Sequence, residues 1–158
     1  MNIQLILFTV ILGTSTTGCI HKNNNENNTT NITNTVQQQK IEKIQLVERT
    51  RGFSRSITVT PLSKEANINE EISNTKIAPA EWKTVSQLAE TIDLSKISEL
   101  KSPTTGRHSD QAMIASIIIT SDGKEYTSSD FDSGRPPKEL EALYNAVNGP
   151  KKTDGPNK

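Results

Sequence analysis

The chain has 158 residues, of which 32% are hydrophobic and 4% aromatic, enough for one domain but low for a uniformly packed globule. Lysine plus arginine and aspartate plus glutamate each total 18, and this zero formal charge argues against a nucleic-acid-binding protein, which needs a basic face. The single cysteine excludes an internal disulfide framework and a multi-cysteine zinc site.

Residues 1–18 carry no charged side chain, and their apolar stretch, Ile3 to Leu12, is too short for an ordinary transmembrane helix. Small residues follow it, as in a secretory signal. The segment ends in two threonines and Gly18 before Cys19, and it resembles the signal of bacterial lipoproteins. The resemblance implies cleavage after Gly18 and an acylated Cys19, carrying chains such as palmitate, as the lipid attachment. The alternative is that Cys19 is an incidental thiol beyond a cleaved secretory signal.

The segment after the cysteine is rich in polar amides, with ten asparagines or glutamines among the seventeen residues 23–39. Such a sequence cannot bury enough apolar surface to offset the entropy lost on ordering. We therefore expect residues 19–40 to be a disordered tether. Glycine, proline and charge dominate residues 149–158, which we expect to be a frayed tail. Residues 41–148 remain as the folded domain.

The first half of this domain contains a predicted hairpin and a predicted helix. Apolar residues from Ile41 lead into a strand, Gly52 supplies a turn, and residues 54–62 are rich in β-branched side chains. The polar residues 63–76 are predicted to be a loop or a partly extended excursion. Pro79 opens a helix in which apolar residues recur at helical spacing: Trp82, Val85, Leu88, Ala89 and Ile92. Residues 93–100 are expected to add a short helical turn.

The second half repeats this order. The isoleucine-rich residues 110–120 predict a strand, and Asp122 with Gly123 predicts a type I′ turn into a returning strand over residues 124–129. Two prolines at 136 and 137 then precede an amphipathic helix that ends near Gly149. The expected fold is α+β, a four-stranded antiparallel sheet in ββαββα order with the helices packed on one face.

The candidate catalytic groups do not form a recognisable site. His108, Ser109 and Asp110 are the residue types of a hydrolase triad, but adjacent residues of an extended segment point in alternating directions. His21 lies in the tether, far from His108, so we expect no metal site. We predict no cofactor, no small-molecule substrate and no enzymatic activity; turnover abolished by changing His108 would revive the hydrolase interpretation.

Three acidic residues lie close together in the second half of the domain. Asp122, Asp130 and Asp132 lack the spacing of oxygen ligands in a calcium loop, so we expect them in solvated turns. Phe131, between two of them, is expected to anchor in the core.

The order of turns and elements resembles the emfourin family of small bacterial protease inhibitors over roughly residues 41–147. The resemblance is carried by the segment from Arg49 to Phe53, the helix over 82–92, Pro103 followed by Asp110, the Asp122–Gly123 turn, and the helix opened by residues 136–140. It implies an α+β inhibitor of thermolysin-type metalloproteases. No contact residue is carried over from the family.

The sequence therefore predicts a membrane-anchored bacterial envelope lipoprotein with a small protein-binding domain that inhibits a secreted or periplasmic metalloprotease. The alternative is a non-inhibitory structural or interaction lipoprotein. Expected partner contacts lie in two exposed turns, at Arg51, Gly52 and Phe53 and at Arg107 and His108. Ile20 follows Cys19 where inner-membrane retention uses aspartate, which favours the outer membrane.

Overall fold

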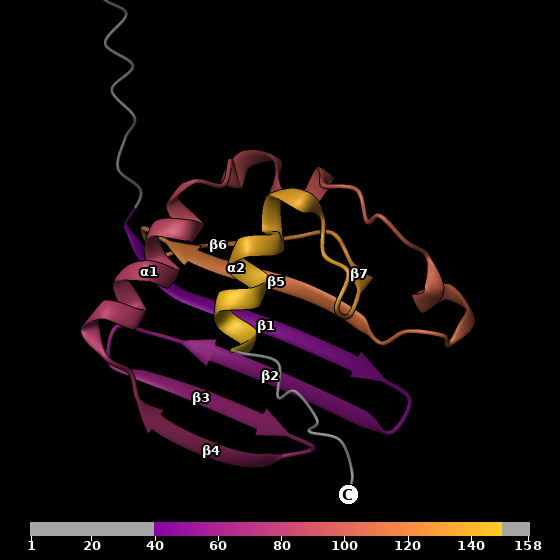
Figure 1. Cartoon of the computed structure of the whole chain (residues 1–158), viewed down its shortest axis with the longest axis horizontal. Helices are drawn as coiled ribbons and strands as arrows, with labels where there is room; N and C mark the ends of the chain where they lie inside the picture. The colour runs from indigo at the N-terminus through magenta and orange to yellow at the C-terminus, as the bar shows by residue number, and fades with distance from the viewer. Residues whose placement is uncertain (1–39, 150–158) are drawn as a thin grey trace, which may run out of the picture. The chain divides into compact units, whose positions relative to one another are not determined.

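The computed structural model describes residues 40–149, so the predicted signal peptide, the predicted tether up to residue 39 and residues 150–158 of the predicted tail lie outside them. The strands are β1 (Ile41–Thr50), β2 (Phe53–Val59), β3 (Ser63–Ile68), β4 (Glu71–Lys76), β5 (Ile114–Ser121), β6 (Lys124–Thr127) and β7 (Phe131–Asp132). The α-helices are α1 (Pro79–Glu90) and α2 (Glu141–Asn148), and three short 3₁₀ helices are η1 (Leu94–Glu99), η2 (Gly106–Ser109) and η3 (Lys138–Leu140). Figure 1 shows their arrangement.

The strands form one antiparallel sheet in an α+β fold. Their order is β4-β3-β2-β1-β5-β6, and β7 pairs with the first residues of β5. In the centre of the sheet Leu46 lies between Ile57 on β2 and Ile117 on β5. The predicted four strands correspond to β1, β2, β5 and β6. Strands β3, β4 and β7 also belong to the sheet, so the expectation of a four-stranded sheet in ββαββα order was wrong.

The additional strands are mostly in the segment that was predicted to be a loop or a partly extended excursion. Residues 63–76 form the β3–β4 hairpin, with six register pairs from Ser63↔Lys76 to Ile68↔Glu71. Every residue of β4 is exposed, so the strand shows no alternation of buried and exposed side chains. The turn is made by Asn69 and Glu70, both at positive φ, without the glycine that usually marks such a turn.

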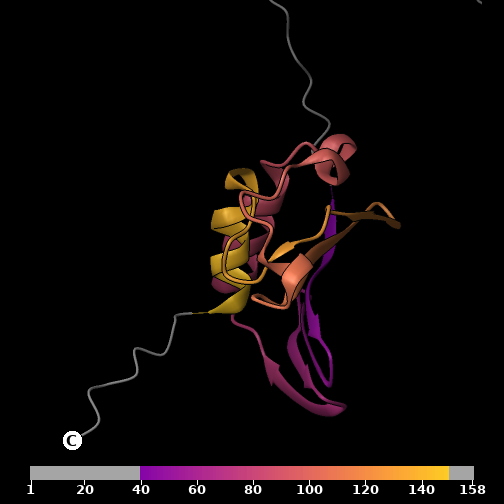
Figure 2. The same ribbon diagram turned by 90° about the vertical axis from the view of Figure 1, so that its right-hand side faces the viewer.

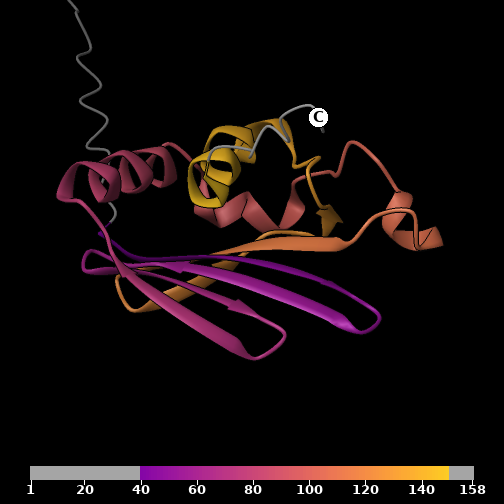
Figure 3. The ribbon, with the colours of Figure 1, turned by 60° about the horizontal axis from the view of Figure 1, so that its bottom comes forward.

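The helices cover one face of the sheet and leave the other face open (Figures 2 and 3). The covered side buries alternate residues of β1, β2 and β5 against Val85 and Ala89 of α1 and against Leu143 and Val147 of α2. Phe131 is fully buried as expected, with its ring edge-on to Tyr144 at 5.9 Å between centroids. An antiparallel sheet with one packed face and one solvated face is the result.

Local sequence signals place several boundaries correctly. Helix α1 begins at Pro79 and ends at Glu90, and Leu94 and Ile97 of the expected short turn are buried in η1. Asp122 and Gly123 both have positive φ, as the predicted type I′ turn requires. Strand β5, however, begins at Ile114 rather than at residue 110, because residues 106–109 form η2 and Asp110 follows it in a left-handed conformation at φ 57°.

Candidate functional site

A buried carboxylate joins the sheet to α2 near the end of β1. Glu48 is 1% exposed and continues the alternation of buried side chains along its strand. Its Oε2 accepts a hydrogen bond from Arg55 Nη1 at 2.6 Å. Its Oε1 accepts from Ser133 Oγ at 2.6 Å and from the Tyr144 hydroxyl at 2.8 Å. Three donors compensate the lost hydration of this charge, so the network holds β2, α2 and the loop after β7 together.

The same network extends along α2. The Tyr144 hydroxyl accepts a hydrogen bond from the backbone N–H of Gly134 at 2.9 Å. One helical turn later, Asn148 Oδ1 accepts from Arg55 Nη2 at 2.6 Å. Burial, with the neighbouring Glu48 carboxylate, raises the pKa of the Tyr144 hydroxyl, which therefore remains a donor at neutral pH.

A second buried carboxylate holds the loop that carries η2. Asp132 is 2% exposed, so the expectation that it lies in a solvated turn was wrong. Its oxygens accept from the backbone N–H groups of Gly106 at 2.7 Å and Arg107 at 2.9 Å, and from Arg107 Nη1 at 3.2 Å. The same guanidinium nitrogen donates to Ser102 Oγ and to the carbonyl of Thr104. The backbone N–H groups of Gly106 and Arg107 thus take the place of water around the Asp132 carboxylate. No sequence motif near Asp132 indicates these donors.

The close fit around Asp132 depends on a glycine. A Cβ built on Gly106 would lie 3.1 Å from Asp132 Oδ2, tighter than ordinary contact. The pKa of Asp132 lies well below its usual range because the nearby Thr104 hydroxyl and the N–H donors of Arg107 and Gly106 favour the charged form. The Thr104 hydroxyl has no partner with full hydrogen-bond geometry, so we regard the N–H groups as the main support.

The expected partner contacts gather at one end of the sheet. The β1–β2 turn carries Arg51 and Gly52, both exposed, and Phe53 is half-buried at the start of β2. The loop with η2 lies toward the same end, on the right in Figures 1 and 3. We call the β1–β2 turn, residues 50–53, together with residues 102–110 the loop end. His108 is exposed there, whereas the Arg107 side chain is 14% exposed and turned inward, so Arg107 positions the loop.

All the arginines of the chain belong to this end of the sheet: Arg49, Arg51, Arg55, Arg107 and Arg135. Two of them pair with the buried carboxylates, and Arg49 lies 3.6 Å from Asp130. The planar guanidinium presents several donors in a fixed arrangement and suits a buried carboxylate better than a lysine does. Arg55 and Arg107 therefore help to hold the ends of β1, β2 and β7 together.

Two hollows open at or beside the loop end. One, of about 500 Å³, lies against Gly52 and Phe53 and extends to the Asn69–Glu70 turn. The other, of about 450 Å³, lies against Gly106 and Asp132 and extends to Arg135. Surface hollows between exposed turns can receive the side chains of another protein.

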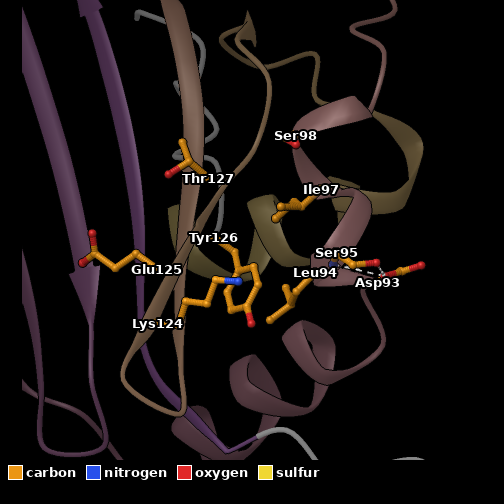
Figure 4. Close-up of a pocket in the computed structure, with 9 residues that line it drawn as sticks. All are labelled: Asp93, Leu94, Ser95, Ile97, Ser98, Lys124, Glu125, Tyr126 and Thr127. Atoms are coloured by element: carbon orange, nitrogen blue, oxygen red, sulfur yellow. Dashed lines mark hydrogen bonds between the residues drawn. The ribbon is translucent and has the colours of Figure 1, made fainter.

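A third pocket lies away from the loop end, between η1 and β6 (Figure 4), with a volume of about 570 Å³. Its ionic groups are already engaged: Lys124 Nζ lies 4.8 Å from the centre of the Tyr126 ring, and Glu125 pairs with Lys43 at 2.9 Å. Asp93 caps η1, and hydrogen bonds from Ser95 lower the pKa of its carboxyl. The polar groups of this pocket thus serve the structure around them.

Comparison with known proteins adds no relative. No family model, curated protein or solved structure matches this chain. The resemblance to emfourin therefore rests on the quoted residues and stays a prediction. The predicted lipid attachment at Cys19 and the predicted cleavage after Gly18 lie outside the described residues.

Two further features of residues 40–149 concern metal binding and membrane spanning. In this range no group of three or more histidine, cysteine, aspartate or glutamate side chains is arranged to hold a metal ion. The helices of the same range are all too short or too polar to cross a membrane.

Sequence reasoning did not find the two buried carboxylates. Glu48 had a usable signal, since it keeps the two-residue period of Ile44 and Leu46 and so had to face the core. Asp132 had none, because its donors come from a loop 25 and 26 residues earlier in the chain.

Proposed function

We propose that this chain is a lipid-anchored bacterial envelope protein whose domain binds another protein through the loop end. The observation that carries the proposal is the attachment of the η2 loop to Asp132. Three hydrogen bonds from Gly106 and Arg107 fix a loop that leaves His108 in solvent. A loop already held in one conformation loses little entropy when a partner binds it.

The adjacent turn supports the same role. Gly52, at φ 75°, closes a two-residue connection and leaves Arg51 exposed. Beyond it, Asn69 Oδ1 accepts from the backbone N–H of Ser54 at 2.9 Å, which ties the β3–β4 turn to the start of β2. Arginine and aromatic side chains are enriched at the energetic centres of protein interfaces, so Arg51 and Phe53 are suitable anchors.

Binding is favoured over catalysis because the buried acids are already satisfied. A general acid or base must exchange a proton with a substrate, yet Glu48 and Asp132 each accept three hydrogen bonds from the protein itself. We therefore assign both carboxylates to positioning the loops.

The partner that the emfourin resemblance suggests is a secreted or periplasmic metalloprotease of the thermolysin type. The anchor at Cys19 would keep such an inhibitor at the outer membrane, since multiple acyl chains hold a protein durably. Incorporation of labelled palmitate tests the anchor, and Cys19→Ser should abolish it.

Titration of the full chain in detergent against a panel of thermolysin-type proteases tests the binding role. We expect stoichiometric inhibition, weakened about tenfold or more by Arg51→Ala combined with His108→Ala. Lys83→Ala, on the exposed side of α1, is the matched control and should inhibit like the unchanged chain. Inhibition unaffected by the double variant would remove the loop end from the proposal. Absence of inhibition would favour the non-inhibitory interaction lipoprotein.

A further inference from the structure

Within residues 40–149, strand β4 is an edge of the sheet to which no further strand pairs. Its six residues pair with β3 on one side, and all their side chains are exposed. Its register with β3 is continuous, so no bulge twists it away, and it contains no proline. Such an edge presents unpaired backbone groups to a further strand. The opposite edge differs, because β6 has only four residues and η1 packs beside it.

The free backbone groups of β4 follow from its turn. In a two-residue hairpin the pair that flanks the turn, here Ile68 and Glu71, exchanges both backbone hydrogen bonds. The alternate residues Ile72, Asn74 and Lys76 therefore direct their N–H and C=O groups outward, away from β3. They form a three-residue ladder that is ready to bond another strand.

We propose that two copies of this chain pair antiparallel along β4, across a two-fold axis that places Ser73 opposite its symmetry mate. The charges of the edge are complementary to themselves in this register. Lys76 of one copy lies opposite Glu70, the turn residue that precedes β4, of the other copy, and this contact occurs twice. A parallel arrangement would instead bring the acidic ends together, which destabilises a strand pair.

The exposed Ile72 supports the same pairing. Its side chain is 61% exposed, one of the largest values for a big hydrophobic residue among residues 40–149. In the proposed register the two Ile72 side chains are diagonal neighbours on the open face of the sheet, within reach of each other. Pairing would therefore withdraw apolar surface from water as well as satisfy the backbone.

Symmetry leaves few other registers. A two-fold axis perpendicular to the sheet keeps each face continuous, so the central residue must lie opposite itself. An axis at Asn74 would put Ile72 opposite Lys76 and Glu71 opposite Ile77, which is buried. Only the axis at Ser73 puts opposite charges face to face at both ends.

A symmetric disulfide tests the register. In the full chain carrying Cys19→Ser, purified in detergent, Ser73→Cys should form a disulfide dimer under mild oxidation, because residues directly opposite in antiparallel strands have the required spacing. Thr75→Cys is the matched control: it is exposed on the same strand face, but its symmetry mate lies about 13 Å along the partner strand. Equal dimer yields at the two positions, or none at Ser73→Cys, would overturn the proposal.

Charge reversal tests the same contact without new thiols. Sedimentation of the Cys19→Ser chain should show a dimer, and Lys76→Glu should raise its dissociation constant at least about fivefold. Adding Glu70→Lys to that variant restores opposite charges and should restore the dimer. A monomer at all concentrations, or a dimer indifferent to both changes, would reject the pairing. These results do not depend on protease inhibition, so this proposal and the proposed function can fail separately.

Discussion

At the scale of single residues, two buried carboxylates fix the segments at and beside the loop end. Glu48 lies among donors from β2, α2 and the loop after β7, while Asp132 takes its donors from the start of η2. Each charge is buried with hydrogen bonds that come from segments far apart in the sequence. Removing one partner should therefore lower the free energy of unfolding by more than one hydrogen bond contributes, because a buried charge is left without that partner.

Asp132 should contribute an acid-sensitive part of the stability. Its pKa is lowered in the folded chain, so its stabilisation is complete above the unfolded value of about 4 and is lost as the pH falls toward the folded value. We expect Asp132→Asn to lower the urea midpoint at pH 7 and to differ less from the unchanged chain at pH 2.5. Asp130→Asn, two residues away and half-exposed, is the control and should change little. A deficit that does not vary with pH would contradict this account.

The Tyr144 hydroxyl should contribute a part of the stability that is sensitive to alkaline pH. Tyr144→Phe leaves Glu48 with one donor fewer and Gly134 N–H without its acceptor, so we expect a loss of about 1–3 kcal/mol in urea unfolding at pH 8. The raised pKa means that the hydroxyl stabilises the fold below about pH 10 and that this contribution declines as the pH rises through the folded value. The deficit of the variant should therefore shrink at pH 11.

Tyr126→Phe is the matched control for this measurement. Tyr126 is partly buried on β6, and its ring, rather than its hydroxyl, makes the contact with Lys124. We expect a change within about 0.5 kcal/mol. Similar losses of unfolding free energy in the two variants would show that the hydrogen bonds of the Tyr144 hydroxyl around Glu48 do not stabilise the fold.

At the scale of elements, the sequence is informative where an element buries one face. The stripe of α1, the alternation of β1 and the Asp122–Gly123 turn all have local signatures, and each appears near its predicted place. The β3–β4 hairpin has none, because β4 buries no side chain and its turn uses Asn69 and Glu70. That hairpin is positioned by the backbone pairing of β3 with β2, and the local sequence does not indicate this pairing.

The β3–β4 turn carries a correctable strain. Glu70 has φ 74°, a left-handed conformation that costs a residue with a Cβ about 1–2 kcal/mol. Glu70→Gly should therefore stabilise the domain by about 1 kcal/mol, after the added freedom of the unfolded chain is counted. Urea unfolding at a concentration where the chain is monomeric measures this change.

Glu71→Gly is the control for the turn. It removes the same side chain one residue later, within the extended strand β4, where glycine is expected to cost about 0.5–1 kcal/mol. Opposite signs for the two substitutions identify backbone conformation as the cause. If both destabilise the domain, the positive φ of Glu70 is not the source of strain.

At the scale of the whole domain, residues 40–149 divide into a covered part and an uncovered part. Strand β1 lies between β2 and β5, and these three strands receive the apolar faces of α1 and α2. The β3–β4 hairpin continues the sheet beyond the helices, as Figure 3 shows. Strand pairing is common to both parts, but burial of apolar side chains belongs mainly to the first. Since burial is the larger source of stability, the two parts should open at different free energies.

Hydrogen exchange of the monomeric chain tests this division. The N–H groups of Ser73 and Thr75 face β3, so they are hydrogen-bonded yet belong to a hairpin whose outer strand is entirely exposed. A two-stranded unit without a buried face is marginal by itself, so these amides should exchange through local opening. We expect their protection factors to be at least about a hundredfold lower than those of Ile44 and Leu46 in β1. Equal protection would mean that the hairpin opens only when the whole domain unfolds, and burial would then not explain the cooperativity of the sheet.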